Sequence, residues 1–170
     1  MLDSSYTGQV ILLLVLLVLS SFFSMSETAL MSLSKIRIRH MVEEGVKGAK
    51  LVEKLIEDPN KLLGAILIGN NIVNIGASSI ATSLAVKLSG GSDSAVIVVT
   101  AIMTVLILIF GEITPKSIAK QKSEQVSLKV SKPIKLCVFI FKPFVAVFTI
   151  ISSVFIFITL NYYLYFSICS

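Results

Sequence analysis

The sequence predicts an all-α integral membrane domain, with three transmembrane helices, amphipathic juxtamembrane helices and assembly as a homodimer. Apolar residues make up 55% of the 170 residues and gather in long uncharged runs, which is typical of membrane spans. Charged residues make up only 15%, against roughly 25% in soluble domains. The basic residues behind the net charge of +5 flank the apolar runs, as they do at cytoplasmic ends of spans. We therefore expect membrane lipid, and no nucleic acid, as a partner.

The first span is predicted at about residues 5–33. No charge occurs from Ser4 to Ser26, a stretch long enough to cross the hydrocarbon core. A cleaved signal peptide is disfavoured, because the N-terminal flank carries Asp3 rather than a base and no small-residue cleavage site follows. Lys35, Arg37 and Arg39 come directly after the span. The positive-inside rule then places the N-terminus outside.

Residues 35–57 carry apolar side chains at helical spacing between charges, which predicts amphipathic helices. Gly45 and Gly48 weaken a helix, so we expect two short helices rather than one. A basic amphipathic segment beside a span commonly lies in the membrane interface. An ordinary cytosolic helical hairpin is the alternative.

Two further spans are predicted at about residues 60–88 and 94–120. Asp58 suits a helix N-cap and Pro59 the first helical position. The glycine-rich turn between these spans carries no base, whereas Lys116, Lys120 and Lys122 follow the third span. Residues 1–132 therefore form a three-span domain in the cell membrane, with the remainder of the chain inside.

Residues 133–170 are apolar but interrupted by Pro133, Lys135, Lys142 and Pro143. The stretch from Pro143 onward is long enough to span. We favour instead a broken interfacial or re-entrant helix and a tail, because Lys135 and Lys142 suit a position near lipid headgroups.

Polar side chains interrupt the first two spans, where they are costly and therefore candidates for function. Ser20 and Ser24 share one face of the first span. The second span carries three amides close together, on Asn70, Asn71 and Asn74. Helix packing through small hydroxyls and interhelical amide hydrogen bonds is the alternative for both groups.

The third span ends in a Gly-Glu-Ile-Thr-Pro sequence beginning at Gly111. Pro115 has no N–H to donate to the carbonyl four residues earlier, which belongs to Gly111. The expected result is a free backbone oxygen beside the carboxylate of Glu112, a pair of hard donors that Mg²⁺ or Na⁺ prefers. Alternatively, Glu112 forms a helical ion pair with Lys116.

No pattern of catalytic residues competes with this interpretation. The chain has no phosphate-binding glycine loop, and its Cys and His residues lack zinc-ligand spacing. We therefore do not expect an enzyme. A twofold dimer is expected to use the Gly- and Ala-bearing faces of the second and third spans, because small residues allow helices to approach closely.

Three motifs, FFSMSETAL, LIGNNIVNI and FGEITPK, lie in this order on the three spans. Together they resemble the membrane domain of the CorC/CNNM family of magnesium transport proteins, over roughly residues 16–133. The resemblance implies a homodimer of three-span protomers with cytoplasmic juxtamembrane helices. It also implies a Mg²⁺ site lined by oxygens from all three spans, and Mg²⁺ efflux coupled to Na⁺ entry. A non-transporting Mg²⁺ sensor or membrane scaffold is the alternative.

By motif position, the resemblance implies specific site residues. The expected metal ligands are Ser24, Asn71, the Gly111 carbonyl and Glu112. The expected lining or supporting residues are Ser20, Asn70, Asn74 and Pro115. Family members continue into paired cytosolic CBS domains that bind nucleotide, whereas this chain stops at Ser170. We therefore expect nucleotide to bind only through domains that are missing here.

Overall fold

The computed structural model describes residues 4–90 and 92–169, and all the regular structure in this part of the chain is helical. The predicted all-helical class is therefore confirmed. The limits of the predicted spans and those of the helices agree to within about one residue. In chain order the elements are α1 (Ser4–Ser32), α2 (Lys35–Glu43), α3 (Ala49–Ile56), α4 (Pro59–Leu88), α5 (Asp93–Ile107), the π-helical η1 (Leu108–Ile113), α6 (Thr114–Gln121) and α7 (Ser123–Cys169).

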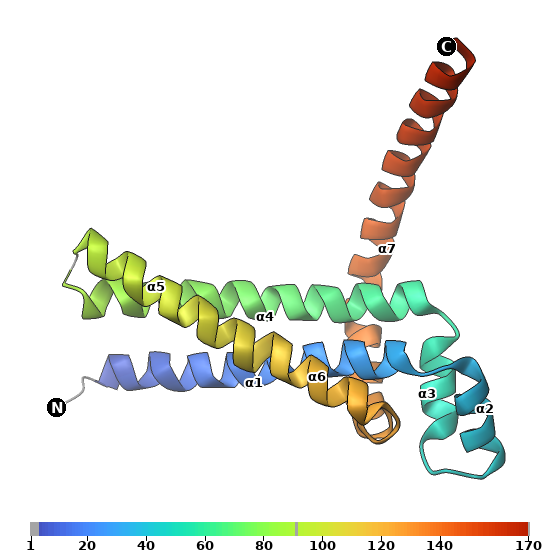
Figure 1. The fold of residues 1–170 in the computed structure, drawn as a ribbon, viewed down its shortest axis with the longest axis horizontal. Coiled ribbons are helices and arrows are strands. Elements are labelled where there is room, and N and C mark those ends of the chain that lie inside the picture. The colour runs from blue at the N-terminus through green and yellow to red at the C-terminus, as the bar shows by residue number, and fades with distance from the viewer. Residues whose placement is uncertain (1–3, 91, 170) are drawn as a thin grey trace.

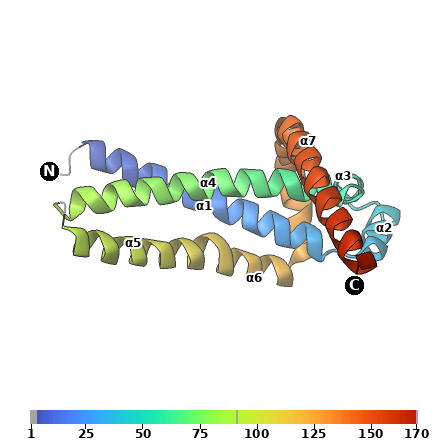
Figure 2. The ribbon, with the colours of Figure 1, turned by 90° about the horizontal axis from the view of Figure 1, so that it is seen from above.

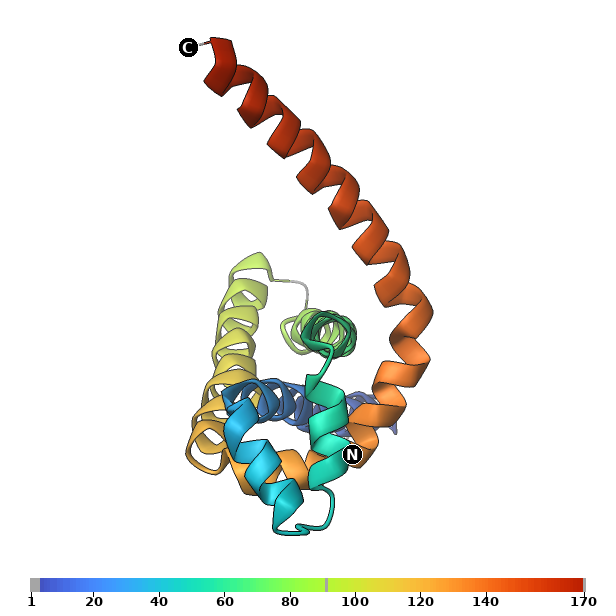
Figure 3. The same cartoon turned by 90° about the vertical axis from the view of Figure 1, so that its right-hand side faces the viewer.

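Within the described residues, four helical stretches are long and apolar enough to cross a membrane, where we expected three: Tyr6–Ser32, Pro59–Leu88, Asp93–Gln121 and Ser123–Thr159. The first two lie lengthwise beside each other, and the third begins beside α4 and ends beside α1 (Figures 1 and 2). The fourth, α7, runs across one end of these three and then extends away from them (Figures 1 and 3). The first part of α7 therefore packs on the bundle, against α1 and α4, and only its later part extends away from it.

The two short helices form as the glycines indicate. Gly45 and Gly48 have φ angles of 71° and 97°, in the left-handed region that favours glycine. The apolar faces of α2 and α3 are buried, including Ile38 and Val52 at 2% exposure each. Helix α3 packs on α1, α4 and α7. The amphipathic pattern thus covers the end of this bundle, rather than leaving its whole apolar face for lipid.

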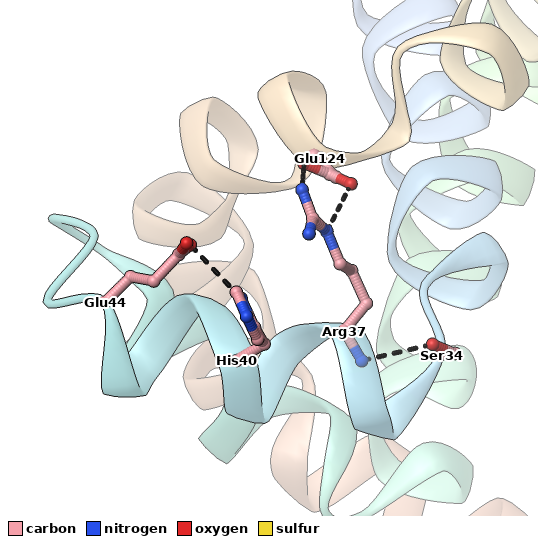
Figure 4. A network of polar contacts seen from close by, with 5 residues as sticks. All are labelled: Ser34, Arg37, His40, Glu44 and Glu124. Atoms are coloured by element: carbon pink, nitrogen blue, oxygen red, sulfur yellow. Dashed lines mark hydrogen bonds and ion pairs between the residues drawn. The ribbon is translucent and has the colours of Figure 1, made fainter.

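Polar contacts fix α2 at its N-terminus and against the start of α7 (Figure 4). The Ser34 hydroxyl accepts a hydrogen bond from the Arg37 backbone N–H at 3.2 Å, which caps the helix. The Arg37 guanidinium donates two hydrogen bonds to the Glu124 carboxylate at 2.7 and 3.0 Å, and these bonds raise the pKa of Arg37. Since Glu124 lies in the first turn of α7, this pair ties α2 to the start of α7.

The expected break within residues 133–170 is wrong, because α7 is one helix that continues through Pro133 and Pro143. Both prolines lie on the exposed side of the helix. Val130, Ile134 and Val145 are buried, at 0–8% exposure. Packing of this inner face holds the helix together across both prolines, although each of them removes one backbone hydrogen bond.

The small residues of α4 are used within the chain. A Cβ added at Gly69 would lie 2.5 Å from the Phe23 ring of α1. Ala77, Ala81 and Ala85, on the same helix, are at most 4% exposed. These residues of α4 are thus covered by α1 and its neighbours within the chain, whereas Gly64 and Gly76 are only partly buried, and the predicted use of the second and third spans in a dimer stays a prediction. Homodimer formation itself stays a prediction.

Candidate functional site

The candidate site lies where α1, α4 and η1 meet. Ser20 and Ser24 of α1 are fully buried, and Asn70 of α4 is 7% exposed. The Ser20 hydroxyl donates a hydrogen bond to the Asn74 side-chain oxygen at 2.6 Å. The predicted polar faces of the first and second spans therefore do meet, across the interface between α1 and α4.

Two buried oxygens of this cluster have no partner. The Ser24 hydroxyl and the Asn70 side-chain oxygen make no hydrogen bond with any described residue. Leaving such a group unpaired costs about 1–3 kcal/mol. Interhelical packing alone does not explain both, because hydrogen bonds that glue helices together would satisfy these atoms. The two unpaired oxygens, near the hydrogen-bonded Ser20 and Asn74, instead suit a cation, which their lone pairs can coordinate.

Gly111 brings the third helix to the same place. It is buried in η1, and a Cβ added to it would lie 2.9 Å from the Ser20 hydroxyl oxygen. Any larger residue would push on the hydroxyl that holds Asn74. The Gly111 position thus requires glycine for its contact with α1, a reason that sequence reasoning did not supply.

The backbone around Gly111 is a π-helix, which the sequence did not predict. Thr114 donates its backbone N–H to the Ile109 carbonyl, five residues earlier. Pro115, which is buried, follows in the first turn of α6. Single-turn π-helices inside α-helices are frequent at functional sites. Proline was the available signal, since a missing N–H favours a local change in hydrogen-bond register.

The expected alternative for Glu112, an ion pair with Lys116, is not formed. The Lys116 ammonium instead lies 3.4 Å from the Glu27 carboxylate of α1. Glu112 is half-buried, and its side chain makes no ion pair or hydrogen bond with another described residue. Gly111 contacts Ser20, and Lys116 contacts Glu27. Along the chain, Glu112 lies between Gly111 and Lys116, and Ser24 lies between Ser20 and Glu27 on α1.

Asn71 lies away from this cluster. It is exposed and lines a groove of about 650 Å³ between α4 and α7, together with Gly64, Val145 and Ser152. One residue along a helix is a rotation of about 100°, so Asn70 and Asn71 cannot both face α1. Of the three amides, the structure turns Asn70 and Asn74 toward the cluster.

The cluster is poor in formal charge. Among residues 4–90 and 92–169, no three His, Cys, Asp or Glu side chains gather closely enough to hold a metal ion. A site at this place therefore consists mainly of neutral hydroxyl, amide and carbonyl oxygens. Such oxygens are ligands for hard cations such as Mg²⁺ and Na⁺, rather than for zinc or copper.

Comparison with known proteins places most of the chain in one group. The model of the family described as "Cyclin M transmembrane N-terminal domain" matches residues 11–160. A UPF0053 protein of Haemophilus influenzae is 46% identical over 143 residues, covering 84% of this chain and 34% of the relative. The UPF0053 inner membrane protein YfjD of Escherichia coli is 43% identical over 109 residues, covering 64% and 25%.

A more distant relative bears a functional name. The polyamine export protein of Salmonella typhimurium is 28% identical over 152 residues, covering 83% of this chain and 34% of that protein. The chain thus spans between a quarter and about a third of the length of these relatives.

Proposed function

Because this chain belongs to the cyclin M transmembrane (CNNM) family, we propose that it is the membrane domain of a divalent-cation transporter whose cargo is Mg²⁺. The buried, unpaired oxygens of Ser24 and Asn70 support the proposal most directly. Glu112 adds a carboxylate without a protein partner, and Gly111 adds a backbone carbonyl on the same helix. Oxygen ligands of this kind suit a hard cation.

The low formal charge of the cluster favours transport over permanent binding. Mg²⁺ sheds its water reluctantly and usually keeps several water ligands. Neutral oxygens and one carboxylate replace these waters only in part, which allows the ion to leave again. We extend the proposal to Mg²⁺ efflux coupled to Na⁺ entry, as the family resemblance implies.

The ligand set is part of the proposal. We assign Ser24, the Gly111 carbonyl and Glu112 as ligands, with Ser20, Asn74 and Pro115 supporting them. For the amide ligand, the family motif points to Asn71, whereas burial and the unpaired oxygen favour Asn70. Comparing Asn70→Ala with Asn71→Ala decides between the two residues.

The first test is calorimetric Mg²⁺ titration of the purified chain. Glu112→Gln keeps the shape but removes the only formal charge of the proposed ligand set, so affinity should fall at least about tenfold. Lys116→Ala is the matched control, because it breaks the pair with Glu27 and leaves the ligands in place. Its Mg²⁺ affinity should be unchanged or higher, since a nearby positive charge is lost. Unchanged affinity in Glu112→Gln would reject the ligand assignment.

The second test is Mg²⁺ flux from liposomes that contain the chain, with and without a Na⁺ gradient. Flux that Glu112→Gln abolishes supports transport. Binding without flux supports the alternative, a sensor or scaffold. The name of the Salmonella relative adds polyamines as a second candidate cargo, so spermidine flux is measured beside Mg²⁺. Spermidine flux without Mg²⁺ flux would replace the proposed cargo.

A further inference from the structure

A second polar feature lies outside the candidate site, at the junction of α3, α4 and α7. These helices enclose a cleft of about 310 Å³ whose charged lining residues are Lys54, Asp58, Lys61, Lys135 and Lys142. Four lysines against one aspartate give the cleft a formal charge of +3. The cation site described above uses none of these residues.

Among the described residues, only one lysine of the cleft has an acidic partner, Lys61. Asp58 caps α4 by accepting a hydrogen bond from the Lys61 backbone N–H at 3.1 Å, and it lies 3.4 Å from the Lys61 ammonium. Lys54, Lys135 and Lys142 form no ion pair or hydrogen bond through their side chains with another described residue. Three lysines from two helices, α3 and α7, therefore line one cleft without an acidic partner among the described residues.

The cleft lies at the edge of the apolar zone. In α4, Lys61 is followed by an uncharged run from Leu62 to Val86. In α7, no charged residue follows Lys142. Two apolar helical segments thus begin at the cleft, so we expect the headgroup layer to meet the hydrocarbon core at this level. Basic pockets between helices at this level suit anionic lipid headgroups.

The remaining lining of the cleft is apolar. Leu51, Leu55 and Val138 contribute to it, and so does Phe139, which is 76% exposed. A small soluble anion would gain nothing from this surface, whereas an acyl chain would cover it. We propose that the cleft binds the headgroup of an anionic phospholipid, with Lys54, Lys135 and Lys142 contacting its phosphate and Phe139 contacting the first part of an acyl chain.

Native mass spectrometry of the full chain in mild detergent tests the proposal, with dioleoyl-phosphatidylglycerol and dioleoyl-phosphatidylcholine as matched probes. Each lysine beside an anionic lipid surface is worth about fivefold in affinity. Lys135→Gln with Lys142→Gln should therefore weaken phosphatidylglycerol binding about thirtyfold. Lys129→Gln with Lys132→Gln removes the same charge from α7 outside the cleft, and should leave binding near that of the wild type.

The other outcomes also decide the matter. Equal losses in the two double variants would replace the cleft with a diffuse basic surface. Binding of phosphatidylcholine as strong as that of phosphatidylglycerol would show that charge does not select the lipid. Displacement of the lipid by millimolar inorganic phosphate would make free phosphate the ligand. If the variant Lys135→Gln with Lys142→Gln does not stay monodisperse, Lys54→Gln on α3 serves instead, with an expected loss of affinity of about fivefold. Unchanged phosphatidylglycerol binding in Lys54→Gln would overturn the proposal.

Discussion

One short hydrogen bond divides the roles of the amides in the polar cluster. Asn74 accepts the Ser20 proton at 2.6 Å, so its oxygen is already engaged by the protein. The Asn70 oxygen is buried and unpaired. An amide oxygen has two lone pairs, but the engaged one is held in a fixed direction. This difference makes Asn74 a residue that positions the cluster, and Asn70 the better candidate for contact with a cation.

Gly111 and Ser20 provide a prediction at the scale of single residues. Gly111→Ala places a Cβ 2.9 Å from the Ser20 hydroxyl oxygen but 3.5 Å from the Ser20 Cβ. The hydroxyl must move, which breaks its hydrogen bond to Asn74. We expect Gly111→Ala to lower the unfolding free energy by about 1–3 kcal/mol and to weaken Mg²⁺ binding.

Removing the obstructing hydroxyl supplies the control. In Ser20→Ala with Gly111→Ala the new methyl group fits, so the double variant should be more stable than the sum of the single effects predicts. Unfolding by denaturant in detergent measures all three variants. Strict additivity would show that the contact between Gly111 and Ser20 does not determine the need for glycine.

At the scale of elements, η1 is the feature that best connects the sequence to the site. Pro115→Ala restores an N–H that can bond to the Gly111 carbonyl in ordinary α-helical register. We expect helix content to stay the same, measured by circular dichroism, while calorimetry shows weaker Mg²⁺ binding because the carbonyl becomes engaged. Wild-type affinity in this variant would mean that the Gly111 carbonyl is not a ligand.

Packing between α1 and α4 allows a matched pair of glycine substitutions. Gly69→Ala would place a Cβ 2.5 Å from the Phe23 ring, whereas Gly76→Ala would meet only Leu16 at 3.6 Å. The aromatic ring lies in the buried interface and has little room to retreat. Gly69→Ala should therefore destabilise the chain by about 1–3 kcal/mol, while Gly76→Ala stays within about 0.5 kcal/mol of the wild type. Equal effects on thermal unfolding would contradict this packing.

Local signals in the sequence predicted the helix limits well. Asp58 caps α4 through the Lys61 N–H, and Gly45 and Gly48 take the left-handed conformations that separate α2 from α3. Such features depend on a few neighbouring residues, so sequence alone reveals them. The π-register of η1 was missed because proline permits several local rearrangements, and packing against Ser20 selects one of them.

Distant contacts were the part that sequence could not supply. Lys116 has an acidic residue on its own helix face, yet it pairs with Glu27 on another helix. Likewise, the three neighbouring amides differ because packing buries Asn70, joins Asn74 to Ser20 of α1 and leaves Asn71 exposed in the groove beside α7. Charge spacing and motif order predict the position of such residues along each helix. The rotation of each helix follows from how whole elements pack.

At the scale of the whole molecule, the described surface bears on how two copies could associate. The alanines of α4 are covered within the chain, while α5 has no buried residue. Ala101 and Val105 of α5 line a shallow apolar groove of about 290 Å³. Lipid or a second copy must cover such a surface in a membrane protein, so α5 offers the predicted homodimer an exposed apolar face, as do Ile72 and Ile75 of α4.

The crosswise position of α7 leads to a prediction about topology. The helix is long and apolar enough to span, but it runs across the end of the bundle formed by α1, α4 and α5 (Figures 1 and 3). If those three helices cross the membrane, α7 lies along the inner interface, and both of its ends stay inside. We expect the N-terminus outside, with residue 92 external and residue 120 internal, because the basic flanks lie at the opposite end.

Cys169 provides the measurement, since Cys137→Ser leaves it as the one thiol of the sequence. In inside-out membrane vesicles a membrane-impermeant maleimide should label Cys169, and in right-side-out vesicles it should not. Ser92→Cys and Lys120→Cys, each in a background without the two native cysteines, calibrate the two sides. Labelling of Cys169 from the outside would make α7 a fourth span, and labelling of position 120 from the outside would refute the three-span topology itself.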